Sequence, residues 1–377
     1  MAGIYIHIPF CKQRCRYCSF FSSTYDARKD DYIDSLCREL EMRQNYLDGA
    51  TIETIYIGGG TPSTLKEEHF RKIFRAIDSG YPVAADAEVT LEANPDDISP
   101  EYAAMLRTLP FNRLSMGVQS FNDRLLKTLG RRHDAQRAVA AFRNARNAGF
   151  GNISMDLMFA LPGSTAASWA EDLSRMLELR PEHISAYNLT YEEGTSLFRA
   201  VQEGSITPLD EDGNLEQFAT LVDTLTAAGY RHYEISNFAL PGRESRHNSS
   251  YWHDIPYLGC GAAAHSYNGN SRQWNVADIG LYIKGINDGE PDYEIENLTE
   301  TERYNDAILT RLRTYDGLPL EWFRNKFSEK YNRYMLKTAE EHISRGTLMH
   351  GDNDTLRLTR KGIFISDAII RDLIFID

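Results

Sequence analysis

The sequence lacks long hydrophobic runs, and it has no excess of basic charge and few cysteines. The N-terminus, MAGIYIHIPFCKQRC, shows none of the basic flank, uninterrupted apolar core or small-residue cleavage site of a secretory signal. No apolar stretch approaches the length that a membrane span needs. Neither a solenoid repeat nor a low-complexity tract is present. We therefore expect a cytoplasmic protein with no membrane span.

The charge balance is acidic, with 41 Lys and Arg against 54 Asp and Glu and a net charge of −13. Proteins that bind nucleic acid as their main partner need a basic face, so this class is disfavoured. Hydrophobic residues make up 42% and charged residues 25%, as in ordinary globular proteins. A chain of 377 residues has room for one large domain and a smaller one.

The cysteines number five, and three of them, Cys11, Cys15 and Cys18, fall within eight residues. Secreted disulfide scaffolds spread and pair their cysteines, so this clustering points to ligation of a metal or cluster. The C-x3-C-x2-C spacing suits a [4Fe–4S] cluster, because three thiolates on a short loop leave the fourth iron open. The open iron can bind the amino and carboxylate groups of S-adenosylmethionine (SAM). Cationic Lys12, Arg14 and Arg16 are expected to favour the thiolate form.

Zinc is the alternative for these cysteines. Structural zinc usually has four ligands in separated pairs. Cys37 and Cys260 are isolated in the sequence, and His7 belongs to a strand-like run. The spacing therefore favours the cluster.

Strand-like and helical patterns alternate through the first half of the chain. The strand-like runs are Ile4–Phe10, Thr54–Ile57, Glu88–Ala93, Arg113–Gln119, Ile153–Phe159 and Ile184–Leu189. Helical spacing marks Asp30–Leu47, Lys66–Ile77, Pro100–Leu109 and Ala166–Leu179. This alternation predicts a parallel sheet, either open or curled into a barrel, with its chemistry at the carboxyl ends of the strands.

The alternation of strand-like and helical patterns ends after Thr190. We predict a helix over Leu209–Ala228, a strand over Tyr230–Phe238, and an irregular functional loop over Arg243–Asn275. Beyond these, helices are predicted over Glu300–Arg313, Leu320–Phe327, Asn332–Arg345 and Lys361–Phe375, with β-like pieces at Leu348–His350 and Leu356–Leu358. We place an α/β domain at 1–235, a connecting region at 236–297 and a smaller, mostly helical, winged-helix-like domain at 298–377.

A glycine triplet, Gly58–Gly59–Gly60, follows the second strand-like run. Glycines let a ligand approach the backbone, because no Cβ stands in the way. A plain turn is the alternative, but the position beside the cysteine loop favours ligand binding.

The chain resembles the radical SAM superfamily and, within it, the oxygen-independent coproporphyrinogen III oxidase family. The matching segments run nearly end to end and are YIHIPFC, GGGTPS, LEANP, RLSMGVQSF, LGRRH, DLMFALPG and LGCGAAAHSYNG. The resemblance implies a partial (β/α)6 barrel with SAM in its mouth. It implies that Tyr5 and Tyr17 flank SAM, that Gly59, Gly60 and Thr61 hold its methionine end, and that Glu92 meets its ribose or amino group. It also implies that Gln119, Arg131 and Asp156 contact a second SAM, with weaker contacts from Thr190 and His265.

Each of these polar residues also has a purely structural interpretation. Glu92, Gln119 and Asp156 could be hydrogen-bonded groups that close the barrel, and Arg131 could be a surface cation. Their positions at the ends of different strands together favour a site.

Two departures separate the chain from the oxidase. Phe20 stands where the oxidase has a fourth cysteine, and we expect the oxidase's N-terminal extension to be absent.

The segment Arg246–Trp252 contains H-N-x-x-Y-W, which resembles the haem-chaperone (HemW) branch of the family. His247 is the leading haem-ligand candidate; the equal alternative is that His247 and Asn248 fix a loop by hydrogen bonds. Cys260, His253 and His265 are weaker haem candidates, and Cys260 is better read as a small buried hydrophobe.

The preferred function is a haem chaperone that binds haem, the cluster and SAM and delivers haem to apo-haemoproteins. The alternatives are oxidative decarboxylation of coproporphyrinogen III, as a coproporphyrinogen dehydrogenase-like oxidoreductase, and radical SAM chemistry on another substrate. The sequence leaves open whether the chain is an enzyme, whether it is a monomer or homodimer, and whether it touches a membrane surface. Basic residues of the C-terminal part alternate with acidic ones, as on a solvated face, so we expect a lid or a protein-docking surface there.

Overall fold

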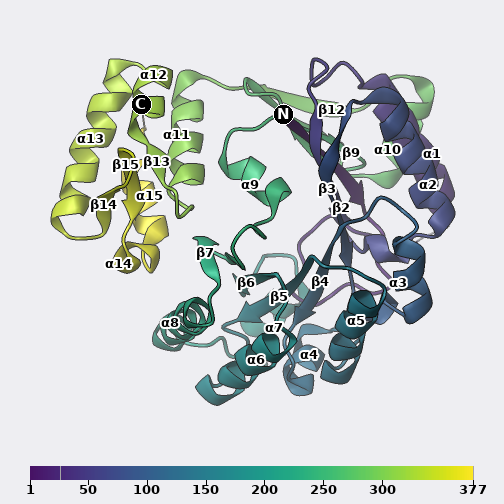
Figure 1. Cartoon of the computed structure of the whole chain (residues 1–377), viewed down its shortest axis with the longest axis horizontal. Helices are drawn as coiled ribbons and strands as arrows, with labels where there is room; N and C mark the ends of the chain where they lie inside the picture. Colours follow the sequence, from purple (N-terminus) through teal and green to yellow (C-terminus); the bar gives the residue numbers. More distant parts are fainter. Residues whose placement is uncertain (26, 377) are drawn as a thin grey trace.

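A twelve-stranded sheet forms the body of the computed structural model, which describes residues 1–25 and 27–376 (Figure 1). Its strand order is β12-β11-β10-β9-β1-β2-β3-β4-β5-β6-β8-β7. Neighbouring strands from β1 to β6 are parallel. These central strands are β1 (Ala2–Ile8), β2 (Ile52–Gly59), β3 (Val83–Ala93), β4 (Arg113–Gln119), β5 (Ile153–Phe159) and β6 (His183–Asn188).

The sheet extends past the parallel strands on both sides. β9 (Tyr257–Cys260) runs parallel to β1. Antiparallel pairing then adds β10 (His265–Tyr267), β11 (Ser271–Asn275) and β12 (Tyr293–Asn297). At the other side, β8 (Asn237–Ala239) pairs antiparallel with β6, and β7 (Arg231–Glu234) pairs with β8.

Alternation along the parallel strands separates an apolar face from a polar one. On β1, the fully buried Ile4, Ile6 and Ile8 belong to the main hydrophobic core. Tyr5 and His7, which lie between them, hydrogen-bond to each other instead. Since successive side chains of a strand point to opposite faces, the core packs against the surrounding helices and the polar side chains face the barrel interior.

Helices follow most of these strands and surround the curved sheet (Figure 1). They are α1 (Lys29–Met42), α2 (Glu67–Gly80), α3 (Pro100–Leu106), α4 (Asp123–Leu129), α5 (Ala135–Asn147), α6 (Ala166–Leu179), α7 (Ser196–Gln202), α8 (Glu211–Ala227), α9 (Arg246–Trp252) and α10 (Ile279–Asp288), with short 3-10 turns at Pro62–Thr64 and Pro95–Asp97. Local sequence signals set several starts: the Thr165 side chain caps α6 by accepting from the Ser168 N–H. Within the described residues, no helix combines the length and apolar character that crossing a membrane requires.

The C-terminal part packs around its own hydrophobic cluster, which includes Tyr304, Phe323 and Ile369. Its helices are α11 (Glu300–Arg311), α12 (Leu320–Lys326), α13 (Glu329–Ser344), α14 (Arg360–Ile363) and α15 (Ser366–Leu373), and its sheet has the order β13 (Leu318–Pro319), β15 (Thr355–Leu358), β14 (Leu348–Gly351). Figure 1 shows this part beside the barrel, next to α9 and β7. A 2.9 Å hydrogen bond from the Tyr315 N–H to the Tyr233 carbonyl ties the two parts together.

The predicted α/β class is confirmed, and Arg113–Gln119, Ile153–Phe159 and Ala166–Leu179 have the predicted bounds. The single strand predicted over Tyr230–Phe238 is wrong, because β7 and β8 form an antiparallel pair there. The prediction of an irregular loop over Arg243–Asn275 is also wrong: α9, β9, β10 and β11 occupy it. These strands are three to five residues long, which is too short for local periodicity to show them, and β9 is also paired with the distant strand β1.

The last helix also differs from the prediction over Lys361–Phe375. It divides into α14 and α15 at Phe364 and Ile365. Neither residue is a glycine or proline; the one local signal is Gly362, just before the break.

Candidate functional site

A cavity of about 550 Å³ lies at the carboxyl ends of the parallel strands. Twelve of the fifteen site residues predicted from the sequence line it: Cys11, Cys15, Tyr17, Cys18, Gly59, Gly60, Thr61, Glu92, Gln119, Arg131, Asp156 and Thr190. They come from the loop after β1, from β2 to β6 near their carboxyl ends and, for Arg131, from the connection between α4 and α5. Tyr5, His247 and His265 do not line it.

The cysteine loop is fixed by backbone hydrogen bonds to three distant segments. The Cys11 N–H donates to the Ser23 carbonyl at 2.9 Å, and the Arg16 N–H donates to the Leu129 carbonyl at 2.9 Å. The Arg16 carbonyl accepts from the Leu197 N–H at 2.8 Å. None of the three cysteines is in a disulfide. The loop therefore presents three free thiols to one cavity.

Arg131 is the cation that contacts a cysteine sulfur. Its Nη1 lies 3.3 Å from Cys15 Sγ, and its Nη2 donates to Asn94 Oδ1 at 2.7 Å and to the Gly117 carbonyl. Its Nε is buried without a hydrogen-bond partner. The surface-cation interpretation of Arg131 is thus wrong, because the guanidinium is enclosed beside the cysteine loop.

The loop cations make other contacts. Lys12 Nζ pairs with Asp97 Oδ1 at 2.6 Å, and Arg16 Nη1 donates to the Thr128 carbonyl at 3.3 Å. Burial raises the pKa of the Cys11 and Cys18 thiols. Binding of iron to these sulfurs must therefore displace protons, which makes cluster assembly more favourable as pH rises.

The glycine triplet leaves space beside the first cysteine. A Cβ added to Gly60 would lie 3.0 Å from Cys11 Sγ and 3.0 Å from the Ile8 carbonyl oxygen. Gly59 has φ +112°, and its Cβ would lie 2.7 Å from the His7 ring. A side chain at Gly59 would overlap the His7 ring, and one at Gly60 would press on its neighbours, so glycine lets the backbone alone face the cavity here.

Glu92 is held by donors on two sides. Its Oε1 accepts from the Tyr56 hydroxyl at 2.7 Å, and its Oε2 accepts from the Gly59 N–H at 3.1 Å. Burial raises the pKa of Glu92 to about 7 and that of Asp156 to about 6. Both carboxyl groups can thus exchange a proton near neutral pH, which is typical of functional sites.

The structure adds residues that the sequence interpretation missed. Asn94 links Arg131 to Thr61, because its Nδ2 donates to Thr61 Oγ1 at 3.3 Å. Arg113 is 1% exposed, and its charge opposes part of the rise that burial causes in the pKa of Glu92 and Asp156; its Nε and Nη1 have no hydrogen-bond partner. Asn94 stands within the quoted LEANP, and a charged residue on a buried strand was the available signal for Arg113.

His247 lies away from the cavity, in the barrel interior near the start of the strands. It is 1% exposed, and its Nδ1 and Nε2 are hydrogen-bonded to Thr54 Oγ1 at 2.8 Å and to the Tyr251 hydroxyl at 2.9 Å. Burial lowers the pKa of His247 to about 3. Both ring nitrogens are thus engaged, so the contacts favour the structural role, while haem ligation by His247 stays an untested prediction.

Tyr5 and His265 also face other partners. The Tyr5 hydroxyl donates to His7 Nδ1 at 3.0 Å, because His7 Nε2 donates to the Phe21 carbonyl at 3.0 Å. His265 is exposed and stacks on Trp274 with a centroid distance of 5.8 Å. Of the weaker haem candidates, Cys260 is fully buried in the hydrophobic core, and His253 Nδ1 donates to the Ser249 carbonyl at 2.7 Å.

Two family models match the chain. The model described as the radical SAM superfamily covers residues 5–176, and the one described as the HemN C-terminal domain covers residues 298–365. The haem chaperone HemW of Bacillus subtilis is 34% identical over 98% of this chain and 98% of the relative. HemW of Mycobacterium tuberculosis is 35% identical over 99% of this chain and 94% of the relative.

The chain belongs to the HemW family of the radical SAM superfamily. The resemblance drawn from the sequence motifs is thereby confirmed, and superfamily membership implies a [4Fe–4S] cluster and SAM. The solved structure of coproporphyrinogen III oxidase (HemN) from Escherichia coli has a TM-score of 0.84 over 99% of this chain and 90% of that one. At 24% identity this likeness shows the fold alone, which confirms the predicted partial barrel with an additional C-terminal part.

The residues present fit such a cluster. Three free thiols face one cavity, and the absence of a Cβ at Gly60 leaves room at the Cys11 sulfur. Arg131 Nε, beside the same loop, is buried without a hydrogen-bond partner. Across residues 1–25 and 27–376, no three His, Cys, Asp or Glu side chains are arranged to hold a single metal ion. Phe20, at the position of the oxidase's fourth cysteine, is 69% exposed and lines the cavity.

Proposed function

We propose that this protein is a haem chaperone of the radical SAM type, which binds haem, a [4Fe–4S] cluster and SAM and delivers haem to apo-haemoproteins. The observation that carries the proposal is the similarity over nearly the whole chain to relatives that are named haem chaperones. Phe20 in the position of the oxidase's fourth cysteine supports the same choice.

Cys11, Cys15 and Cys18 would hold three irons of the cluster, and Arg131 would offset its negative charge from beside Cys15. When bound, the cluster supplies an electron for reductive cleavage of SAM. The backbone of Gly59 and Gly60 would offer hydrogen-bonding groups to the methionine end of SAM.

The carboxyl ends of β3, β4 and β5 would bind the rest of that ligand. Glu92 is oriented by the Tyr56 hydroxyl and by the Gly59 N–H, so its carboxylate is already fixed before a ligand arrives. Gln119 and Asp156 face the same cavity from neighbouring strands, and Tyr17 and Thr190 close it. A fixed polar surface of this kind reduces the entropy lost on binding.

The test of haem binding is a titration of the anaerobically reconstituted protein with haemin. We expect uptake of haem in a stoichiometric amount with a shift of the Soret band, followed by transfer to an apo-haemoprotein in solution. A Soret band that does not shift when the protein is added to haemin would refute the proposed chaperone function.

A matched set of variants separates the cluster from the haem. Replacing Cys11, Cys15 and Cys18 together by alanine should remove the iron–sulfur absorbance, whereas Cys37→Ala should keep it, because Cys37 packs against the core outside the cavity. Retention of the iron–sulfur absorbance in the triple variant would refute the assigned ligands.

The second candidate is oxidative decarboxylation of coproporphyrinogen III, which is supported by the three cysteines and most of the predicted SAM-contact residues lining one cavity. Anaerobic incubation with coproporphyrinogen, SAM and a reductant would then give protoporphyrinogen. Product no greater than that from the cysteine-free variant would exclude this activity. The boundaries of residues 1–235, 236–297 and 298–377, a cytoplasmic location and apo-haemoprotein partners stay predictions.

A further inference from the structure

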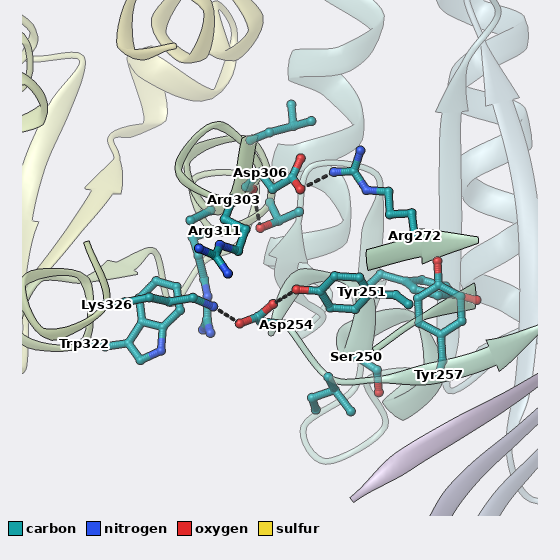
Figure 2. A pocket seen from close by; sticks show the side chains of 15 residues that line it. Ser250, Tyr251, Asp254, Tyr257, Arg272, Arg303, Asp306, Arg311, Trp322 and Lys326 are labelled. Atoms are coloured by element: carbon teal, nitrogen blue, oxygen red, sulfur yellow. Dashed lines mark hydrogen bonds and ion pairs between the residues drawn. The ribbon is translucent and has the colours of Figure 1, made fainter. Parts of the chain in front are cut away.

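A second cavity, of about 200 Å³, lies where α9 and the sheet meet the C-terminal helices. Figure 2 shows its lining, with Arg272 reaching in from β11, Arg303 and Arg311 from α11, and Trp322 and Lys326 from α12. It shares no lining residue with the cavity at the cysteine loop. It is therefore a separate site.

Cations outnumber carboxylates in this lining. The charged side chains are Arg272, Arg303, Arg311, Lys326, Asp254 and Asp306. Figure 2 shows both carboxylates already engaged, Asp306 with Arg272 and Asp254 with Lys326. Two arginines, Arg303 and Arg311, are left without a carboxylate partner among the described residues.

Arg311 is held in place although no ion pair of its own is formed among the described residues; the nearest carboxylate that acts on it, Asp254, is paired with Lys326. Its Nη2 donates to the His253 carbonyl at 3.3 Å, and its guanidinium lies 4.7 Å from the centre of the Trp322 ring. Burial lowers the pKa of Arg311. A cation that has lost part of its water and has no ion pair of its own binds an incoming carboxylate more strongly than an exposed cation does.

The shape of the cavity limits what can enter. Pockets that enclose a whole drug-sized ligand have about 300–1,000 Å³, so this cavity accepts the charged arm of a ligand rather than an entire macrocycle. Leu309, which lines the cavity, is an exposed apolar side chain. The apolar ring of such a ligand, lying outside the cavity, would contact Leu309 next to the charged groups.

We propose that this cavity binds the propionate side chains of a tetrapyrrole through Arg303 and Arg311. Arginine pairs with a carboxylate through two parallel N–H···O hydrogen bonds, so two arginines match two propionates. Trp322 and the tyrosines of the lining add aromatic surface beside the charged groups. The inference rests on the proposed haem-binding function and names the place where the ligand's charge is recognised.

The experiment compares haemin with its dimethyl ester, which has the same ring but no carboxylates, by absorbance titration of the full-length protein in one detergent-containing buffer. The variants are Arg303→Gln and Arg311→Gln. The control is Arg324→Gln, because Arg324 lies on α12 with Trp322 but pairs with Asp354 at 2.6 Å and does not line the cavity.

We expect each variant to bind haemin about tenfold more weakly, since a hydrogen bond to a charged group is worth about one factor of ten in affinity. The unaltered protein should bind the diester more weakly than haemin by a similar factor or more, and neither variant should weaken diester binding further. Arg324→Gln should bind haemin as the unaltered protein does.

Equal binding of haemin and the diester by the unaltered protein would overturn this inference and leave the chaperone function intact. This comparison needs no substitution, so it decides the question even where Arg311→Gln fails to fold. A protein that binds neither ligand would overturn the proposed function and the inference with it.

Discussion

Gly60 offers a direct test of the cavity at the cysteine loop, through the substitution Gly60→Ala. A Cβ at this position would lie 3.0 Å from Cys11 Sγ, 3.0 Å from the Ile8 carbonyl oxygen and 3.1 Å from the Phe10 nitrogen. Ordinary contacts of a Cβ begin at 3.4 Å, so these neighbours must give by a few tenths of an ångström. Two of the three are backbone atoms of β1 and of the segment after it, which cannot move without breaking the hydrogen bond from the Gly60 N–H to Ile8.

The expected magnitude follows from the packing. Insertion of a methyl group into a well-packed site costs about 1–3 kcal/mol of unfolding free energy. The atom that yields most easily is the Cys11 sulfur, because it ends a side chain, so we expect the cluster ligand to be displaced. Gly60→Ala should therefore lower iron content and SAM affinity together.

The assay is the iron–sulfur absorbance of the reconstituted protein, with unfolding in urea measured alongside. Gly151→Ala is the matched control, because a Cβ at Gly151 meets nothing within 4 Å and should leave both measurements unchanged. A Gly60→Ala protein with the iron content and unfolding midpoint of the unaltered chain would refute the reasoning.

Two further predictions concern buried titratable groups. Glu92 has a pKa of about 7 against 4.5 for a free side chain, so in the cluster-free protein its contribution to stability is complete below pH 4.5 and is lost as pH rises through 7. Glu92→Gln should remove at most about 3 kcal/mol of this pH dependence between pH 5 and 8, and an unchanged slope in urea unfolding across that range would contradict the burial argument. His247→Ala should lower the unfolding free energy by about 2–4 kcal/mol, because it leaves a void and unpairs Thr54 and Tyr251. The folded variant should keep the Soret band of the haem-loaded protein, and loss of that band would instead make His247 the ligand.

The parallel barrel could be predicted because its elements carry strong local patterns. β4, β5 and α6 have the predicted bounds, since each is a continuous run with one clear periodicity. Most of the twelve predicted residues that share the main cavity follow the same logic: parallel strands bring their carboxyl ends to one edge, so residues at or just after those ends meet.

The predictions failed where an element depends on a distant partner. β9 is four residues long and exists because it pairs with β1, more than 250 residues earlier in the chain. Arg131 could not be placed beside Cys15 from the sequence, because the contact spans 116 residues. The hydrogen bond between His247 and Thr54 could not be predicted from the sequence for the same reason, since Thr54 lies on β2, 193 residues away.

The sequence alone determined that this protein has three clustered thiols, a glycine triplet beside them, and a fold whose strand ends converge, because spacing and periodicity are local properties of the chain. Only the tertiary structure decided which charges are paired. Arg131 is enclosed next to a sulfur, whereas Arg303 and Arg311 line a cavity without forming an ion pair with any carboxylate in the described part of the chain. Pairing depends on distances between side chains that are far apart in the sequence, and these distances exist only once the chain has folded.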